Sequence, residues 1–275
     1  RQCEFEQAGV EMLGASGAAA DAEVIVLAAE ALQAAGLQKF AISLGHVDFI
    51  NGLAEEAGFD AAQLQQLKDY LRRHDAVGMQ QMADAMENIR TEIKQLFADF
   101  LFLQGGIELL DKVAAIVTNA KCQGALNDLR KIYKLVDAYG AAGYLSFDLG
   151  LYRSLDYYTG MLFEVYLPEM GYPVAGGGRY DKMMQRFGLE CPATGFAVGV
   201  DRVLLALERN GVATNNRTWD VLVTWSEGKL PEAIAKATAL RREGRSVKLL
   251  TEAADLQGAA LAVKEYGCKS LVYVE

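Results

Sequence analysis

The sequence predicts an α+β fold: an antiparallel sheet flanked by helices, with a helical insertion and a small C-terminal α/β domain. Three observations predict it. Residue types alternate with a period of two at both ends of the first 210 positions, and the block at about 46–140 has apolar residues three and four apart. From residue 218 onward, strand and helix patterns alternate. We therefore expect a core domain over residues 1–210 and a second domain over residues 218–275.

The core is expected to begin with a strand, a helix and a second strand. After Gly143 the period returns to two, which indicates further strands. The predicted elements of the core are strands at 1–14 and 39–45, a helix at 20–35 ending at Gly36, antiparallel strands at 144–150, 155–166 and 171–180, a short helix at 178–188, a strand at 193–200 and a helix at 201–211.

The block at about 46–140 is expected to pack as a helical subregion of its own, and its longest predicted segment covers residues 79–103. A polar, turn-rich linker at 210–218 separates the core from the second domain. The second domain has predicted strands at 220–225, 246–251 and 270–274 and predicted helices at 230–244 and 256–267. Such alternation indicates a parallel or mixed sheet.

The composition excludes several function classes. The 275 residues carry a net charge of −9, which disfavours general nucleic-acid binding because that affinity rests on neutralising phosphates. The chain lacks the ~18 apolar residues in a row that a membrane span needs, and no signal peptide opens it, so we expect a cytoplasmic protein. Four widely spaced cysteines and two histidines predict free thiols, with no disulfide framework, metal site or cofactor. Because the chain opens at Arg1 in a strand, we expect the N-terminal part of the core to be absent.

Gln7 and Glu11 are candidate ligand-binding residues on the first predicted strand. They are four residues apart and therefore project from one face, with Gly9 between them leaving room. An amide and a carboxylate over a glycine suit a small cation or an imidazole N–H. The alternative is a solvent-exposed polar face of an edge strand.

A second candidate cluster lies at the start of the strand predicted over 155–166. It contains Arg153, Asp156, Tyr157 and Tyr158. Phenols can flank and hydrogen-bond a ligand, and an arginine offers a planar fork to a carboxylate or phosphate. The alternative is a core strand of aromatic residues from which Arg153 extends to solvent.

Two further segments carry glycines and arginines. In AGGGRYD (175–181) three glycines allow a close backbone approach or a sharp turn, after which Arg179 would open a helix. In PATGFAVGVDR (192–202) the small residues permit tight strand packing. Arg202 lies in the first helical turn against the dipole preference, which indicates another use such as a phosphate contact. The alternatives are a tight strand-to-helix turn and an ion pair of Arg202 with Asp201.

Taken in order, these four segments resemble the histidyl-tRNA synthetase-like core of class II synthetases. EFEQAGVEMLG is similar to the end of class II motif 2 with its histidine-binding glutamine and glutamate, and RSLDYYTG to the histidine-specific signature usually written RGLDYY. AGGGRYD is similar to the second histidine-specific segment, and GFAVGVDRVLLAL to motif 3, whose arginine contacts ATP. The match spans nearly all of residues 1–210.

Two groups within this family fit the sequence. SLGHVDFINGLAEEAG and LQGGIELLDKVAAI resemble the regulatory subunit of ATP phosphoribosyltransferase, a paralogue that does not charge tRNA. Ser154 in the signature and Asp201, where synthetases usually have glutamate, point the same way. Arg153, at the position of the synthetase's catalytic arginine, favours the alternative of a histidyl-tRNA synthetase that activates histidine with ATP. A stand-alone histidine-binding module is a third interpretation.

The resemblance to the regulatory subunits implies a non-catalytic protein of histidine biosynthesis. Such a protein joins the short-form ATP phosphoribosyltransferase catalytic subunit, is required for its activity and binds histidine for feedback control. The resemblance also implies a dimer within a hetero-oligomer, no tRNA charging, and a C-terminal domain resembling an anticodon-binding domain.

The same resemblance implies roles for individual residues. Glu11 and Gln7 would hold the α-amino group or the imidazole of histidine, and Arg153 would approach its carboxylate. The expected histidine-binding residues are Gln7, Glu11, Arg153, Tyr157, Tyr158 and Tyr180, where the tyrosines form the walls. Arg202 is expected to be a vestigial nucleotide contact, and no residue is expected to be catalytic.

Overall fold

The computed structural model describes residues 4–153, 157–212 and 219–275. Ser154 of the signature, Asp156 of the predicted cluster and most of the predicted linker lie outside the described residues. The chain divides into two compact units, Arg1–Val212 and Ala213–Glu275. Each unit is described by itself.

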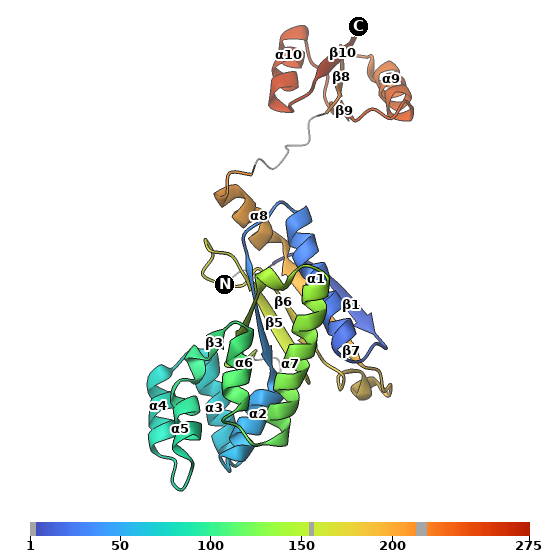
Figure 1. Ribbon diagram of the computed structural model, residues 1–275. Coiled ribbons are helices and arrows are strands. Elements are labelled where there is room, and N and C mark those ends of the chain that lie inside the picture. Colours follow the sequence, from blue (N-terminus) through green and yellow to red (C-terminus); the bar gives the residue numbers. More distant parts are fainter. Residues whose placement is uncertain (1–3, 154–156, 213–218) are drawn as a thin grey trace. The chain divides into compact units, whose positions relative to one another are not determined.

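The first unit is built on a seven-stranded sheet with the strand order β1-β7-β6-β5-β2-β4-β3. Figure 1 shows these strands and the helices around them. The strands are β1 (Gln7–Leu13), β2 (Ala41–His46), β3 (Gln104–Gly105), β4 (Leu145–Asp148), β5 (Met161–Tyr166), β6 (Ala175–Arg179) and β7 (Ala193–Gly199). Together with its flanking helices, this sheet confirms the predicted α+β class.

Strand β4 differs from the prediction in its pairing. All neighbouring strands are antiparallel except β2 and β4, which run parallel with Leu44 opposite Phe147. The helical block separates these two strands in the sequence and brings the chain back to the same edge, as a parallel pair requires. The prediction of one antiparallel run after Gly143 was therefore wrong for the place of its first strand, because β2 lies between β4 and β5, although β4 does run opposite to β5. The two-residue strand β3 inside the helical block was not predicted.

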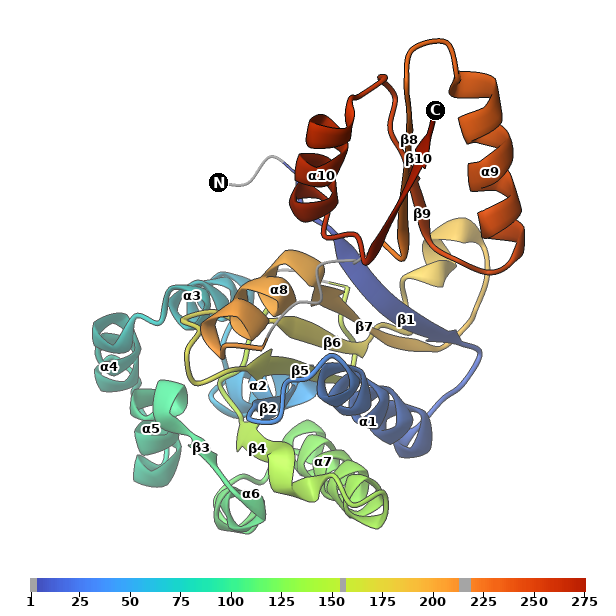
Figure 2. The same ribbon diagram turned by 90° about the horizontal axis from the view of Figure 1, so that it is seen from above.

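The two faces of the sheet differ in composition. Directly paired residues share a face, so Val10, Phe196, Gly177, Phe163 and Leu44 form one row across five strands. Phe196, Gly177, Phe163 and Leu44 are buried. Helices α1 (Ala18–Ala34) and α7 (Ala120–Ala138) pack on this sheet. Figure 2 shows α1 and α7 side by side against the strands. The opposite face carries small and polar residues, which leaves room for a ligand.

The predicted helix at 20–35 and the predicted helix at 201–211 are both present. Helix α1 ends before Gly36, whose φ of 103° only glycine adopts readily, and α8 spans Val200–Arg209 directly after β7. Helix α1 is rich in alanine, and this small side chain lets the helix approach the sheet closely. Ala22 and Ala28 are fully buried.

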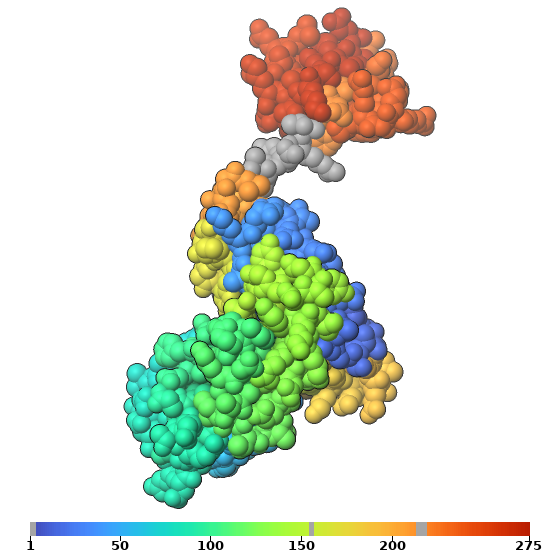
Figure 3. Space-filling model, viewed as in Figure 1, coloured from blue at the N-terminus to red at the C-terminus, as the bar shows by residue number. Residues whose placement is uncertain are grey.

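The helical block is present with one break, and its buried residues join those of the sheet in one core. The segment predicted over 79–103 is interrupted between Asp84 and Thr91, where Asn88 has a φ of 56° that ends regular helix. In Figure 3 the green side chains of this block form a continuous surface. Its remaining elements are α2 (Val47–Glu56), α3 (Ala61–Arg73), α4 (Ala76–Asp84), α5 (Thr91–Ala98), the 3₁₀ turn Phe100–Phe102 and α6 (Ile107–Ala114).

Two local predictions around the glycine-rich segment were wrong. Strand β5 begins at Met161, so Tyr157 and Tyr158 lie in the loop before it. The glycines Gly176–Gly178 lie inside β6 and form no turn, and Arg179 ends that strand. The helix predicted at 178–188 is reduced to a 3₁₀ turn at Met184–Phe187. The strand predicted over 171–180 is thus confirmed as β6, whereas a sharp turn at its glycines was wrong.

The second unit contains the alternation that the sequence predicted. Its three strands are parallel, in the order β10-β8-β9. Val221 and Val223 pack with α9, whereas Leu222, on the other face, packs with Ala262 of α10. The elements are β8 (Val221–Trp225), α9 (Leu230–Arg242), β9 (Val247–Leu249), α10 (Leu256–Glu265) and β10 (Ser270–Val274). Within the described residues, no helix of either unit combines the length and apolar character that crossing a bilayer requires.

Candidate functional site

The candidate site lies on the polar face of the seven-stranded sheet, over a floor of glycines. Glu11 of β1 is directly opposite Gly195 of β7, which is opposite Gly178 of β6. A Cβ atom on Gly195 would collide with the Glu11 carboxylate, and one on Gly178 would lie 2.8 Å from the ring of Tyr158. In the adjacent row, a Cβ on Gly176 would collide with the guanidinium of Arg153. The glycines therefore make the space in which the predicted site residues lie.

Four of the predicted residues form a continuous set of contacts. The hydroxyl of Tyr180 donates a hydrogen bond to Oε2 of Glu11. The ring of Tyr157 meets Tyr180 edge-on with a centroid separation of 5.7 Å and lies 4.6 Å from the ring of Tyr158. Burial raises the pKa of both Tyr158 and Tyr180, and the Glu11 bond raises that of Tyr180 further. These phenols are therefore neutral hydrogen-bonding groups at physiological pH.

Arg153 extends this set of contacts toward β5. Its guanidinium carbon lies 5.9 Å from the centroid of the Tyr158 ring, and its Nε lies 3.6 Å from Oε1 of Glu164. Its Nη1 is inaccessible to solvent and has no hydrogen-bond partner among the described residues. The sequence did not single out Glu164. The signal that could have identified Glu164 is its acidic side chain between Phe163 and Val165, which are both fully buried.

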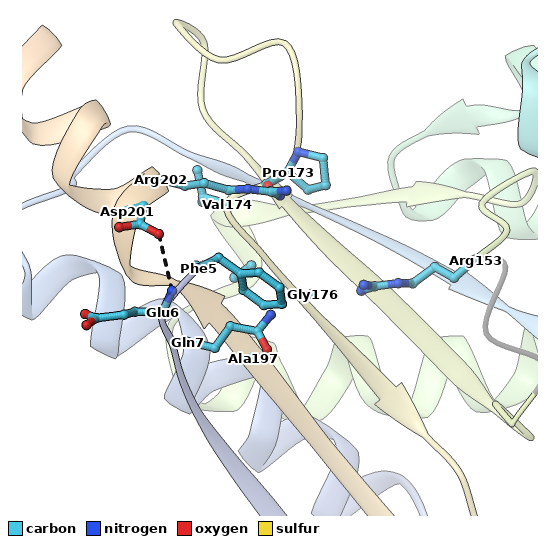
Figure 4. A pocket seen from close by; sticks show the side chains of 12 residues that line it. Phe5, Glu6, Gln7, Arg153, Pro173, Val174, Gly176, Ala197, Asp201 and Arg202 are labelled. Carbon is cyan, nitrogen blue, oxygen red and sulfur yellow. Dashed lines mark hydrogen bonds between the residues drawn. The ribbon is translucent and has the colours of Figure 1, made fainter. Parts of the chain in front are cut away.

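One cavity of about 350 Å³ opens beside Arg153 and Gln7. Figure 4 shows Arg153 reaching toward it from the side opposite α8. Arg202 lines the same cavity, where its Nη1 donates to the carbonyl of Pro173 and its guanidinium lies 5.0 Å from the ring centroid of Tyr172.

The predicted alternative of an ion pair between Arg202 and Asp201 was wrong. Oδ2 of Asp201 instead accepts a hydrogen bond from the backbone N–H of Glu6 at 3.3 Å. The reason is geometric, because Arg202 turns toward the Pro173 carbonyl in the β5–β6 connection.

A second cavity, of about 510 Å³, is lined by Tyr157 and Tyr158 together with residues of α2 and of the segment after β6. The six predicted histidine-binding residues therefore do not line one cavity, and neither of these two cavities is lined by Glu11 or Tyr180. Gln7 and Arg153 line the first cavity, and the two tyrosines line the second. Contacts from Arg153 through Tyr158 and Tyr157 link the two cavities.

A buried ionic cluster holds the tyrosine-bearing loop in place. Nε of Arg179 donates to Asp21 of α1 at 3.0 Å, and its Nη1 donates to Asp181 at 2.8 Å. The backbone N–H of Asp181 donates to the hydroxyl of Thr159, whose own N–H donates to the carbonyl of Arg179. Burial raises the pKa of Asp21, and Arg179 opposes that rise. The sequence did not predict Asp21, because its partner is 158 positions away.

The donor set at this site suits an organic ligand. Among the described residues, no group of three or more His, Cys, Asp or Glu side chains is arranged to hold a metal ion. A carboxylate, a guanidinium and three phenols around a glycine floor can bind a small molecule that has an aromatic ring, a donor and an acidic group.

This fold and this arrangement define a class II synthetase-like protein, and the chain belongs to the family described as histidyl-tRNA synthetase, which matches residues 1–203. A crystal structure titled as a histidyl-tRNA synthetase from Nostoc sp. PCC 7120 has the same fold, with a TM-score of 0.76 at 21% identity. It is matched over 96% of this chain and 66% of its own.

Within that family, its relatives are ATP phosphoribosyltransferase regulatory subunits, which confirms the resemblance predicted from the sequence. The one from Acetivibrio thermocellus is 37% identical over 94% of this chain, and the one from Desulforamulus reducens is 40% identical over 90%. A structure from Bacillus halodurans, titled as an ATP phosphoribosyltransferase regulatory subunit/histidyl-tRNA synthetase, matches with a TM-score of 0.80 and 32% identity over 98% of this chain and 69% of its own. The chain spans 62% and 61% of the length of the two curated relatives.

Proposed function

We propose that the chain is a regulatory, non-catalytic part of an ATP phosphoribosyltransferase complex and that it binds free histidine for feedback control. The observation that supports the proposal is the set of contacts from Glu11 through Tyr180, Tyr157 and Tyr158 to Arg153. It places an anionic acceptor at one end and a cationic donor at the other, with aromatic walls between them. Histidine has the complementary groups, which are N–H donors, a flat ring and a carboxylate.

In the proposed complex, Glu11 and Gln7 form hydrogen bonds with the imidazole or the α-amino group of histidine. Tyr180 uses only Oε2 of Glu11, so the second carboxylate oxygen remains for a ligand N–H. Tyr157 and Tyr158 pack on the ring, and Arg153 binds the carboxylate. Arg202 remains a vestigial nucleotide contact in this proposal, because its guanidinium is already held by Pro173 and Tyr172.

The proposed partner is the short-form catalytic subunit of ATP phosphoribosyltransferase, which would depend on this protein for activity. The protein is proposed to act in the cytoplasm as a dimer within the hetero-oligomer. Histidine can inhibit such an assembly only if it binds two states of it with different affinities. The names of the relatives support this partner.

Reconstitution tests the proposal. The complete protein is mixed with a short-form catalytic subunit, and gel filtration and phosphoribosyl transfer are measured with and without histidine. We expect one co-eluting complex whose activity requires this protein and falls when histidine is added. Separate elution of the two proteins, or activity that is indifferent to histidine, would contradict the proposal and favour a stand-alone histidine-binding module.

A second candidate function is histidyl-tRNA synthetase activity. The observation that favours it is the presence of both Arg153 and Arg202 on the 350 Å³ cavity, since a synthetase needs cationic groups around ATP. Aminoacylation of tRNA with radiolabelled histidine and ATP distinguishes the two functions. We expect no charged tRNA above the level of a no-enzyme control, and robust charging would replace the regulatory proposal.

A further inference from the structure

Glu164 is an acidic side chain in an otherwise apolar strand. It lies in β5, where its register partners are Gly176 on β6 and Ser43 on β2, so it projects from the same sheet face as the candidate site. Only 15% of its side chain is exposed. A largely buried carboxylate is unfavourable unless it is paired, so the polar contacts of Glu164 do more than fill space.

Both oxygens of Glu164 are engaged. Oε2 accepts a hydrogen bond from the hydroxyl of Tyr166 at 2.5 Å, and Oε1 lies 3.6 Å from Nε of Arg153. Burial and the bond to Glu164 raise the pKa of Tyr166, so its phenol remains a donor across the physiological range. Tyr166 thus fixes the carboxylate from one side, and the carboxylate faces Arg153 on the other.

This contact determines where the rest of the Arg153 fork points. With Nε turned toward Glu164, Nη1 lies against Gly176 and has no acceptor among the described residues. Arg153 also lines the cavity beside Gln7. Because Nη1 is inaccessible to solvent, a ligand in this cavity would meet the exposed part of the Arg153 side chain, which is 25% exposed.

We infer that Glu164 is a positioning residue that aims Arg153 at the carboxylate of the bound amino acid, so that the site selects ligands with a carboxylate. The inference rests on the proposed histidine-binding function and extends it, because it assigns ligand selectivity to a residue that does not itself touch the ligand. The Glu164 charge holds Nε of Arg153, and the exposed part of the guanidinium then presents a charged donor to the ligand.

The test compares L-histidine with histamine, which has the same ring and amine but no carboxylate. Calorimetric titrations are made on the complete protein in complex with its catalytic subunit. In the wild-type protein, we expect histidine to bind at least tenfold more tightly than histamine. Glu164→Gln keeps the shape and the Tyr166 contact but removes the charge, so histidine affinity should fall about tenfold while histamine affinity stays within twofold.

Two further variants make the result specific. Glu169→Gln is the matched control, because Glu169 is an exposed acid in the β5–β6 connection, and it should change neither affinity. Arg153→Ala should remove the preference for histidine, and adding Glu164→Gln to it should cause no further loss, since the two residues act as one unit.

Equal losses for histidine and histamine in Glu164→Gln would mean a merely structural role and would overturn the inference. Unchanged histidine affinity in that variant would overturn it as well. In both cases wild-type binding of histidine would leave the proposed function standing. If the wild-type protein binds no histidine at all, the proposed function and the inference fall together. Circular dichroism of each variant establishes that the fold is retained.

Discussion

The hydroxyl of Tyr180 reaches the carboxylate of Glu11 although strand β7 lies between their strands. The bond is possible because Gly195, the β7 residue opposite Glu11, has no side chain in the way. Strand β1 therefore forms one small polar surface with β6 and β7, which are distant from it in the sequence. The candidate site depends on the floor of the sheet as much as on the side chains above it.

Removing the acidic end or an aromatic wall of the polar surface is predicted to weaken histidine binding. Glu11→Ala deletes a charged acceptor and Tyr158→Ala deletes a wall, and each should cost about 1.5–3 kcal/mol of binding free energy. Calorimetry on the complex with the catalytic subunit measures the change. Tyr139→Ala, at a tyrosine that is 59% exposed, is the control and should bind as the wild type does. Unchanged affinity in both site variants would place the pocket elsewhere.

A methyl group on the glycine floor is predicted to destabilise the protein. In Gly178→Ala the new Cβ would lie 2.6 Å from the carbonyl oxygen of Met161 and 2.8 Å from the Tyr158 ring. Such overpacking should lower the free energy of unfolding by about 1–3 kcal/mol, measured by urea denaturation. Gly124→Ala is the matched control at an exposed position of helix α7, where a Cβ meets nothing within 4 Å, and it should stabilise by about 0.5–1 kcal/mol. A Gly178→Ala protein as stable as the wild type would contradict the proposed floor.

Asp148 is predicted to make stability fall as pH rises from about 4 to 6. Burial raises the pKa of its carboxyl to about 6, with hydrogen bonds from Gly150 and Gln104 opposing the rise. In this range the unfolded chain has already lost the proton, whereas the folded state keeps it until it is deprotonated near pH 6. Asp148→Asn should remove this decline and raise the unfolding free energy at pH 7.

Unfolding free energies at several pH values measure the effect, as the difference between wild type and variant. Asp137→Asn, at an exposed position, should leave the profile unchanged. Parallel pH profiles of the wild-type and Asp148→Asn proteins would show that this carboxyl titrates normally in the folded state.

His46 is predicted to make stability fall as pH decreases, which is the opposite of the effect predicted for Asp148. It is buried at the N-terminus of α2, where its Nδ1 accepts the backbone N–H of Asp48, and burial lowers its pKa. The unfolded chain therefore takes up a proton first, and stability should fall as pH drops below about 6.5. His46→Asn keeps an N-cap acceptor and removes this dependence. His74→Asn, at an exposed left-handed position that asparagine tolerates, is the control, and an equal effect of both variants would contradict the assignment.

The sequence predicted the elements whose patterns are local. Period-two alternation placed Gln7 and Glu11 on one face of β1, and the alternation of strands and helices after residue 218 predicted the parallel sheet of the second unit. Their periodicity is set by neighbouring residues, so a single segment is sufficient to recognise it.

The remaining features depend on partners that are distant in the sequence. Tyr157 and Tyr158 have strand-forming residue types, yet their segment bonds to Arg179 and forms a loop. The pairing of Glu164 with Arg153 and that of Arg179 with Asp21 were not predicted, because residue type does not indicate which charges meet after folding. The parallel direction of β4 likewise depends on how the helical block returns the chain to the sheet.

A crystal structure of the complete protein soaked in L-histidine tests the central claim most directly. The account predicts ligand density on the glycine floor, with an N–H of the ligand bonded to Glu11, the ring against Tyr158 and the carboxylate at Arg153. A well-occupied histidine at another place, with these three side chains unchanged and no density among them, would contradict it.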